Sequence, residues 1–264
     1  MPRVSPPVRT RLIILLTLMP AFLAAAPYTA FRDGEAFTYR VGFAIFSKAG
    51  EITITADDER KDGADLMRVI TETRSRGIVR GLYAFDNQAE VIINKASGRL
   101  VSVKESGAEP KRASDSETTF DYQERIMRHM DRVRTERTAD VPIPDGDPLD
   151  LISALVQTRD WDLKPGEKRD VLVHFGRDLY PLVIHAEGYE EVRTPLGKYK
   201  TLVLVPRMTG EPKGLFKRGG EIKVWIAQDG SKLPVKMQLV LKYGTASLLL
   251  SDYKAPAGAA TARK

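Results

Sequence analysis

Cysteine is absent from this chain of 264 residues. Disulfide bonds are therefore excluded, and so is lipid attachment to a cysteine behind an export signal. A chain without cross-links has to be stabilised by its core, and 42% hydrophobic residues are enough to build one at this length. The composition is that of a folded protein and not of a disordered chain.

Histidine is also scarce, with three residues, and this limits metal chemistry. His129, His174 and His185 have no second histidine or carboxylate at the spacing of a helical zinc motif. Asp145–Gly146–Asp147 resembles the start of a calcium loop, but the later ligands are missing, and a turn before a helix accounts for it. The sequence predicts no metal site.

The motifs of nucleophilic and nucleotide-dependent enzymes are missing as well. No serine lies in a Gly-x-Ser-x-Gly turn, and no glycine-rich loop precedes a helix, so we expect no catalytic residue and no cofactor. Ser251–Asp252–Tyr253–Lys254 spells Ser-x-x-Lys, but on a strand its serine and lysine point to opposite faces. Acidic pairs such as Glu190–Glu191 fall at predicted strand ends, which makes an envelope hydrolase with paired carboxylates the least favoured class.

The beginning of the chain has the three parts of an export signal. Three arginines form a basic start, Leu12–Ala24 is apolar, and small residues fill 24–26. The apolar run is short for a bilayer span and Pro20 weakens it as a helix, so we expect no transmembrane span after cleavage. We therefore predict a signal peptide at 1–26 and a periplasmic location for the remainder.

The charge of the chain does not predict binding to nucleic acid. The 41 basic residues include the three arginines of the signal, so 38 remain against 35 acidic residues. An excess this small and this dispersed predicts no nucleic-acid partner, and it permits only weak attraction to anionic lipid headgroups.

Alternation of apolar and polar residues, the pattern of half-buried strands, dominates the rest of the chain. FTYRVGFAI keeps its large apolar residues on one parity and is predicted to pair with 51–55 through a turn at 47–50. VWIAQDGSKLPVKMQLVL is predicted to be a second hairpin with Asp229–Gly230 in its turn. The charged segment 125–137 is predicted to be an exposed or edge strand, with a polar helix as the alternative.

These two hairpins define a candidate interior. If the sheet curls, side chains of one parity line a concave surface, and they either fill it or leave room for an apolar ligand. The predicted interior residues are Phe37, Tyr39, Val41, Phe43, Ile45, Val235, Met237, Leu239 and Leu241.

One helix is predicted, over 148–158. Asp147 is a candidate N-cap, Pro148 fits the first helical position, and apolar residues follow at helical spacing. The predicted fold class is mainly β, a curved antiparallel sheet or an incomplete β-barrel with this one short helix.

The helix divides two β-rich halves, 31–143 and 166–253. We assign both halves to a single domain at 27–254, because no long linker separates them. The small and polar residues 255–264 are predicted to be a disordered tail.

Two candidate surfaces remain. Trp225 lies on the opposite parity from the aliphatic residues of its strand, so another element should cover it, and the helix at 148–158 is the first choice. Arg128, Arg132 and Arg134, in the charged segment, form a candidate docking surface for a protein partner in the cell envelope.

Four phrases of the sequence stand out by their order and spacing: GEAFTYRVGFAIFSKAGEITI, DPLDLISALVQTRDWDLKPGEK, TPLGKYKTLVLVP and GGEIKVWIAQDGSKLPVKMQLVLKYGTASLLL. Together they resemble the exported bacterial family called domain of unknown function 3108, over about 34–250. The resemblance implies export and a β-rich fold with one short helix, and it carries no catalytic residue. The closing hairpins also look like those of periplasmic lipoprotein carriers, which are half-open β-barrels with helical lids, although such carriers usually have more than one helix.

Three classes of function remain open. The favoured one is non-enzymatic binding or carrying of an apolar or amphiphilic ligand of the envelope, because apolar stripes are present and catalytic motifs are not. A structural or protein-interaction module is the alternative, and an envelope hydrolase is the third class.

Overall fold

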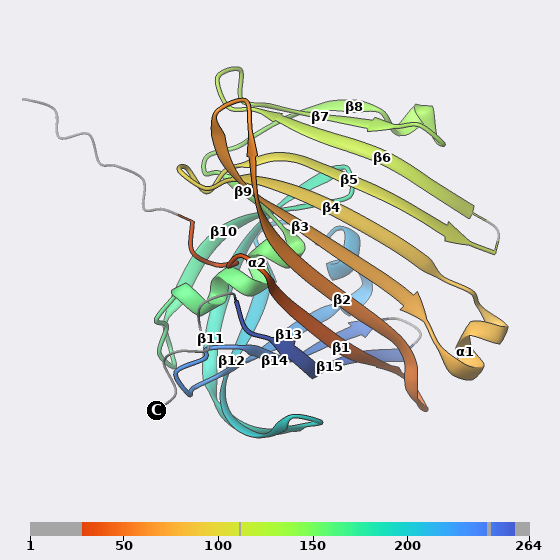
Figure 1. Ribbon diagram of the computed structural model, residues 1–264, viewed down its shortest axis with the longest axis vertical. Helices are drawn as coiled ribbons and strands as arrows, with labels where there is room; N and C mark the ends of the chain where they lie inside the picture. The colour runs from red at the N-terminus through yellow and green to blue at the C-terminus, as the bar shows by residue number, and fades with distance from the viewer. Residues whose placement is uncertain (1–27, 111, 242–243, 257–264) are drawn as a thin grey trace, which may run out of the picture.

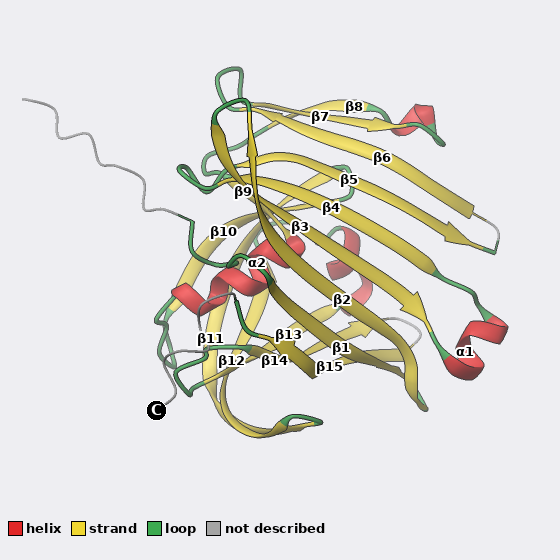
Figure 2. Cartoon of the chain, viewed as in Figure 1, coloured by secondary structure: helices red, strands yellow, loops and turns green. Residues whose placement is uncertain are grey.

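The structure is a computed structural model, and it describes residues 28–256 except 111 and 242–243. The predicted signal peptide and most of the predicted tail lie outside these residues. Within these residues, fifteen strands form one sheet, with antiparallel neighbours everywhere except at the β9–β10 edge, where the pair is parallel (Figures 1 and 2). The predicted class, mainly β with a curved antiparallel sheet or an incomplete β-barrel, is confirmed, and a second short helix, Gly77–Leu82, was not predicted.

The elements follow one another along the chain with short connections. The first part comprises β1 Glu35–Phe43, β2 Phe46–Lys61, β3 Ala64–Ser75, α1 Gly77–Leu82, β4 Asp86–Asn94, β5 Leu100–Glu109, β6 Arg112–Asp121, β7 Ile126–Asp131, the 3-10 helix η1 Thr135–Arg137 and β8 Ala139–Pro142. The second part comprises β9 Pro148–Asp150, α2 Leu151–Gln157, the 3-10 helix η2 Thr158–Asp160, β10 Lys168–Phe175, β11 Asp178–Thr194, β12 Gly197–Met208, the 3-10 helix η3 Gly214–Gly219, β13 Glu221–Ala227, β14 Pro234–Leu241 and β15 Gly244–Lys254.

The order of the strands in space places the first and the last described strand at the centre of the sheet. The order runs from β8 back to β1, continues directly into β15, and then runs back to β9. The first and last strands therefore pair with each other, with Phe37 opposite Tyr253 and Val41 opposite Leu248. The edges are the two short strands β8 and β9.

The two ends of the sheet meet through side chains and not through a hydrogen-bonded ladder. Met127 of β7 packs in one cluster with Leu172 of β10 and Leu179 of β11. The ring of Phe120 meets the ring of His174 edge-on, with 5.4 Å between their centres. In the described part of the chain no ladder joins β8 to β9, so the sheet curves round without closing as a barrel.

Helix α2 lies inside the curve of the sheet, between strands β1–β3 and strands β10–β11 (Figure 1). Its start is fixed by Asp150, whose Oδ1 accepts hydrogen bonds from the backbone N–H groups of Ile152 (2.9 Å) and Ser153 (3.2 Å). Leu155 and Val156 are buried in the main core. The helix thus covers apolar side chains that the concave face would otherwise expose.

The position of this helix differs from the prediction. The cap is Asp150 and not Asp147, because Pro148–Asp150 forms strand β9 beside β10 before the helix begins. The carboxylate of Asp147 is engaged elsewhere, with Arg99 (2.8 Å) and Arg125 (3.5 Å). Extended backbone at Pro148 gains ladder bonds for its neighbours, and this outweighs the fit of proline to a first helical turn.

The other end of α2 is held by a buried ion pair. The guanidinium of Arg159 in η2 lies 2.9 and 3.0 Å from the two carboxylate oxygens of Glu35, and it also donates to the carbonyl of Ala30 (3.1 Å). The hydroxyl of Tyr253 donates to the same carboxylate. Burial, and then the hydrogen bond to Glu35, raise the pKa of Tyr253 to about 12. The pair therefore fastens the helical segment to both β1 and β15.

Two further differences concern the first half of the chain. The turn of the first hairpin is at Ala44 and Ile45 and not at 47–50, since Ala44 adopts a left-handed φ of 49° and β2 already begins at Phe46. The charged segment 125–137 does contain a strand, β7, but this strand is not at the edge of the sheet, because β8, which follows the segment, pairs with it and forms the edge.

Among the described helices, none has the length and apolar character needed to cross a bilayer.

Candidate apolar binding site

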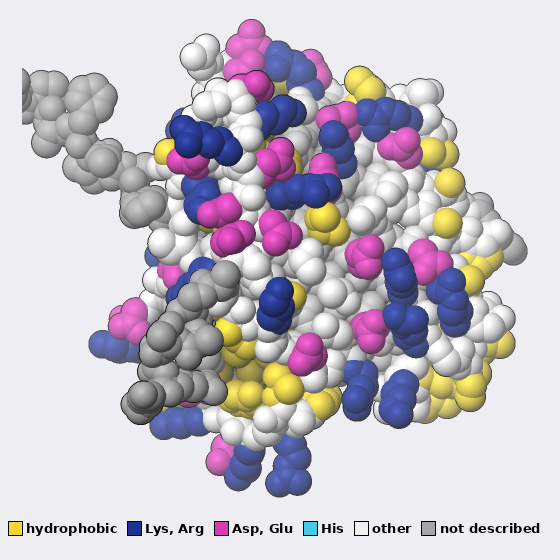
Figure 3. All heavy atoms as spheres, viewed as in Figure 1, with side chains coloured by type: hydrophobic (Ala, Val, Ile, Leu, Met, Phe, Trp, Pro, Cys, Tyr) yellow, Lys and Arg dark blue, Asp and Glu magenta, His cyan; other side chains and the backbone are white. Residues whose placement is uncertain are grey.

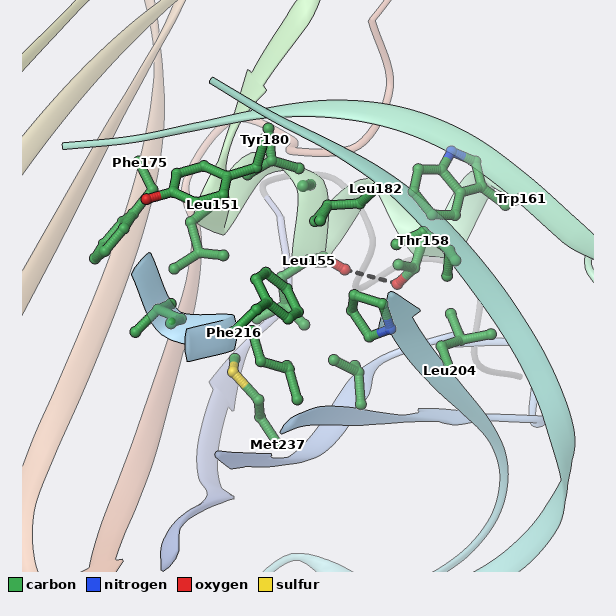
Figure 4. Close-up of a pocket in the computed structure, with 17 residues that line it drawn as sticks. Leu151, Leu155, Thr158, Trp161, Phe175, Tyr180, Leu182, Leu204, Phe216 and Met237 are labelled. Atoms are coloured by element: carbon green, nitrogen blue, oxygen red, sulfur yellow. Dashed lines mark hydrogen bonds between the residues drawn. The ribbon is translucent and has the colours of Figure 1, made fainter. Parts of the chain in front are cut away.

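A pocket lies beneath α2, on the concave face of the sheet, and we call it the α2 pocket (Figure 4). It is built from α2 and the residues after it, strands β10–β14, and η3. Its lining residues are Leu151, Ala154, Leu155, Thr158, Trp161, Val173, Phe175, Tyr180, Leu182, Ile184, Leu204, Pro206, Leu215, Phe216, Ile222, Val224 and Met237.

Strand periodicity explains why these side chains converge. Tyr180, Leu182 and Ile184 alternate along β11, so all three point to the same face. Ile222 and Val224 do the same on β13, where they face the helix. The pocket is therefore formed by regular strands, and only η3 adds an irregular wall.

Polar chemistry is almost absent from this pocket. The hydroxyl of Thr158 donates to the carbonyl of Leu155 (2.6 Å), so it is satisfied within the wall (Figure 4). Burial and the nearby carboxylate of Asp178 raise the pKa of Tyr180, so its hydroxyl stays neutral at physiological pH. Such a lining can bind a hydrocarbon chain. It contains no charged side chain that could bind an ionic group or activate a nucleophile.

The wall contributed by η3 consists of Leu215 and Phe216, which are half-buried. The ring of Phe216 lies 6.5 Å from that of Tyr180, measured between centres. Gly214 and Gly219, at the two ends of η3, both have positive φ, at 53° and 78°. Two apolar side chains thus enter the pocket from a short loop with glycine at each end, in a segment that is otherwise polar.

The remaining cavity is small, at about 60 Å³. Pockets that bind small molecules usually have a volume of roughly 300 to 1,000 Å³. The α2 pocket as it stands is therefore too small for an alkyl chain, and part of the wall would have to move aside to admit one.

A polar groove of about 430 Å³ lies on the other side of Trp161. Trp161 and Gln157 line it, and the indole N–H of Trp161 and the side-chain oxygen of Gln157 have no hydrogen-bond partner among the described residues. The guanidinium of Arg169 lies over the indole ring, 4.9 Å from its centre. Trp161 therefore separates an apolar space from a polar one.

Most of the predicted interior residues lie in the core. Phe37, Tyr39, Val235 and Met237 are buried, and Val41 and Leu239 are partly buried against the same cluster. The structure brings these two sets together because β15 lies between β1 and β14. Among those with described side chains, Met237 is the one that lines the α2 pocket.

Three predicted interior residues are placed differently. Ile45 is 89% exposed because it lies in the turn, where the alternation of the strand ends. Phe43 is half-buried at the end of β1. Leu241 ends β14, and its side chain is outside the description.

Several pocket residues were missed from sequence, although signals existed for them. The alternation of Tyr180, Leu182 and Ile184 has the same form as the one used for β1. Leu215–Phe216 is an apolar pair in a polar loop, which is unusual for a connection on the surface.

Trp225 is buried, but not by the predicted helix. Its indole N–H donates to the carboxylate of Glu190 (2.8 Å), and the ammonium of Lys236 lies 4.0 Å from the ring centre. Because Ile222 and Val224 face α2, the alternation of β13 turns Trp225 to the opposite side of the sheet. Neighbouring strands supply its cover.

The arginines of the charged segment are paired with carboxylates of their own surroundings. Arg128 pairs with Asp121 and Glu124, and Arg132 with Asp115 (2.9 Å) and Glu117 (2.6 Å). Arg134 pairs with the buried carboxylate of Asp131 (3.0 Å). Much of the positive charge of the candidate docking surface is thereby compensated.

Among the described residues there is no group of three or more metal-ligating side chains.

One solved structure shows a similar fold at low sequence identity. A β-barrel-like protein of domain of unknown function DUF1849 from Brucella abortus has a TM-score of 0.54 and 7% identity, and the match covers 83% of this chain and 96% of that one. A putative exported protein with a YmcC-like fold from Bacteroides fragilis has a TM-score of 0.35 and 13% identity, over 88% of this chain and 100% of that one. A putative lipoprotein from Parabacteroides distasonis has a TM-score of 0.33 and 10% identity, over 85% and 98%.

Comparison with curated protein sequences finds no match. The family model for proteins of unknown function DUF3108 matches residues 38–251, which include every strand that contributes to the α2 pocket. The chain therefore belongs to the DUF3108 family.

Proposed function

We propose that this protein binds an apolar or amphiphilic molecule of the cell envelope in the α2 pocket, in the periplasm, without catalysing a reaction on it. The observation that carries the proposal is a pocket lined almost entirely by hydrocarbon in the concave face of the sheet. An alkyl chain gains about 0.8 kcal/mol for each methylene that it removes from water. The export signal read from the sequence supplies the location.

Entry of the ligand takes place at η3. Helix α2 is fastened at both ends, by the Asp150 cap and by the Arg159–Glu35 pair. The wall formed by Leu215 and Phe216 is held less firmly, because glycines flank it and the ion pair described at its start, Lys213 with Asp178 (3.8 Å), is exposed. Outward rotation of η3 removes two large side chains from the pocket and leaves α2 in place.

The polar groove beside Trp161 favours an amphiphile over a pure hydrocarbon. An alkyl chain in the α2 pocket brings its head near Trp161, where the indole N–H and the side-chain oxygen of Gln157 have no partner within the described part of the chain. A neutral or zwitterionic head with both donors and acceptors would satisfy them.

Binding of a fluorescent fatty-acid analogue to purified protein tests this proposal. Ala154→Leu adds bulk to a cavity of about 60 Å³ and should weaken binding at least tenfold. Phe216→Ala removes the ring from the η3 wall and should strengthen binding several-fold. Val240→Ala, at a site 37% exposed on β14, is the matched control and should bind like the wild type.

Native mass spectrometry of protein taken directly from the periplasm gives a second measurement. A co-purifying mass of lipid size is expected with the wild type and should be reduced with Ala154→Leu. Protein that is consistently empty and that ignores the probe would contradict the proposal.

A protein-interaction role for Arg128, Arg132 and Arg134 is the alternative proposal. Its test is reversal of the three charges followed by a pull-down from envelope extracts. Loss of a specific partner with retained folding would support it, and unchanged pull-downs would rule it out.

A further inference from the structure

One end of the molecule exposes apolar side chains that the fold does not use. Ile45 is 89% exposed, Leu82 74% and Ile78 73%, and these are the most exposed large hydrophobic residues in the described chain. Tyr83 beside them is 46% exposed. We call these four residues the α1 tip. Figure 3 shows hydrophobic side chains gathered at the lower right, where Figure 1 places α1 and the β1–β2 turn.

The two segments of the α1 tip lie side by side. The backbone N–H of Arg76, just before α1, donates to the carbonyl of Ala49 in β2 (2.8 Å). The guanidinium of Arg76 lies 2.8 Å from the carboxylate of Glu51 in the same strand. Because Ile45 immediately precedes β2, these bonds place it at the same end of the molecule as α1 (Figure 1).

The loop that carries α1 is held firmly at its base. The N–H of Ser75 donates to the carbonyl of Phe85 (2.8 Å), and the N–H of Phe85 donates to the hydroxyl of Ser75 (2.9 Å). Arg80 forms two hydrogen bonds to the carboxylate of Asp86, at 3.0 and 2.9 Å. The apolar residues are thus presented outward on an ordered base, which reduces the entropy that a binding partner would have to remove.

Stability of the fold does not account for these side chains. Helix α1 has six residues, none of them buried, and no side-chain cap. It contains Gly77 and Gly81, which disfavour helix in water. A solvated connection would have polar residues at these positions, so the described fold does not explain Ile78 and Leu82.

Basic residues surround the α1 tip. Segments 40–51 and 72–86 contain five basic residues against three acidic ones. Within the part of the chain that the structure describes, Arg40 and Lys48 have no salt bridge, and both are exposed. Figure 3 shows Lys and Arg side chains next to the hydrophobic ones at this end. These basic side chains complement the anionic headgroups of a bilayer. The apolar side chains can then enter the region between the headgroups and the acyl chains.

We propose that the α1 tip docks the protein on the surface of a bilayer that contains anionic phospholipid, with Ile45, Ile78 and Leu82 inserted. The size of the patch favours a bilayer over a protein. A stable protein interface needs roughly 800 Å² on each partner, which is far more than two adjacent turns provide. A bilayer accommodates a small projecting tip because the lipids move aside. This proposal does not depend on the α2 pocket.

Sedimentation with lipid vesicles tests the proposal, using the protein purified after expression of the full chain. The vesicles contain phosphatidylcholine with about a third phosphatidylglycerol, or phosphatidylcholine alone. The wild type should bind the anionic vesicles at least tenfold more tightly than the neutral ones. Ile78→Ser combined with Leu82→Ser should weaken this binding at least tenfold.

The matched control is Val133→Ser combined with Leu196→Ser, at sites 49% and 41% exposed outside the α1 tip. It should bind vesicles like the wild type, and circular dichroism should show all variants folded. Leu82→Trp supplies a reporter, since the two native tryptophans are 3% and 6% exposed. Its fluorescence should shift to shorter wavelength with anionic vesicles.

Three results would overturn the proposal. They are no binding of the wild type to anionic vesicles, equal binding by the Ile78→Ser/Leu82→Ser variant, and capture by a membrane protein in extracts without binding to protein-free vesicles. Loss of probe binding in the α2 pocket would not affect the outcome, so the two proposals fail separately.

Discussion

The two α-helices among the described residues differ in how they place their apolar side chains. Helix α2 begins at a side-chain cap and buries Leu155 and Val156. Helix α1 has no side-chain cap and buries no residue, and it exposes Ile78 and Leu82 at 73% and 74%. Both helices are short, so neither would be stable alone in water. The tertiary contacts of α2 account for its sequence, whereas those of α1 leave its apolar side chains unexplained.

This difference distinguishes apolar residues that stabilise the fold from apolar residues that bind a partner. Substitution of a buried apolar residue should lower the free energy of unfolding. Substitution of an apolar residue that is exposed on an ordered base should leave the free energy of unfolding unchanged and weaken binding of the partner. The predictions below test that separation.

Breaking the buried ion pair should have the largest effect. Glu35→Ala leaves the guanidinium of Arg159 without its partner at a site where the two side chains are 0% and 5% exposed. Loss of one member of a buried pair costs about 3–5 kcal/mol. Urea unfolding measures this loss. Glu191→Ala, in the exposed pair with Lys198, is the control and should change little. Similar losses in both variants would show that the Glu35 pair does not fasten α2.

Leucine-to-alanine substitutions compare the two helices directly. Leu155→Ala should destabilise the protein by about 2–5 kcal/mol, because a buried leucine leaves a cavity. Leu82→Ala should leave stability nearly unchanged, because the side chain is 74% exposed. Thermal and urea unfolding of both variants measure the difference. A large loss with Leu82→Ala would mean that α1 does contribute to the fold.

Acidification should weaken the seam where the ends of the sheet meet. Burial lowers the pKa of His174 to about 4, from an ordinary value near 6.5. The unfolded chain therefore takes up a proton before the folded one does. The stability that the neutral imidazole of His174 contributes is fully present above pH 6.5. It is lost as the pH falls toward 4, and the loss in the free energy of unfolding is on the order of 3 kcal/mol in total.

The variant His174→Leu isolates this effect. Burial also lowers the pKa of His129, which acts in the same direction, and raises the pKa values of Asp150 and Glu105, which act in the opposite one. The difference between variant and wild type removes these shared contributions. Unfolding free energies between pH 4 and 7 should depend less steeply on pH in the variant. Parallel curves would contradict the assignment to His174.

Removing the cap of α2 should have the smallest effect of the four. Asp150→Ala frees the N–H groups of Ile152 and Ser153 and should cost about 1 kcal/mol. Asp150→Asn keeps an acceptor at the same place and should retain most of the stability. Melting temperatures of the three proteins measure the effect. Equal melting temperatures would show that β9 alone fixes the start of α2.

Regular alternation made much of the sheet predictable. In the second hairpin, β13 ends at Ala227 and β14 begins at Pro234, as the turn residues between them indicate. The carboxylate of Asp229 accepts a hydrogen bond from the N–H of Ser231 (3.0 Å), which is the expected role of aspartate in a turn. Local chemistry determines these features, and local chemistry can be read from sequence.

Features that depend on distant contacts could not be predicted. Glu35 and Arg159 are 124 residues apart, and nothing near either residue indicates the other. The segment DGDPLD offers two aspartates that could cap a helix, and pairing of β9 with β10 selects the second. The α2 pocket likewise depends on η3 folding back over the sheet. Its apolar pair was visible in the sequence, but the place where it docks was not.

The pairing of β1 with β15 has a consequence for how the chain folds. The centre of the sheet is completed only when the last strand is available, because β1 has β2 on one side and β15 on the other. The first half, β1–β8, can form its antiparallel hairpins early, but one side of β1 stays unpaired until residues 244–254 arrive. Premature termination before β15 would thus leave two unpaired strand edges in the middle of the structure, which are sites for aggregation. The main core of such a protein is complete only after β15 has been made.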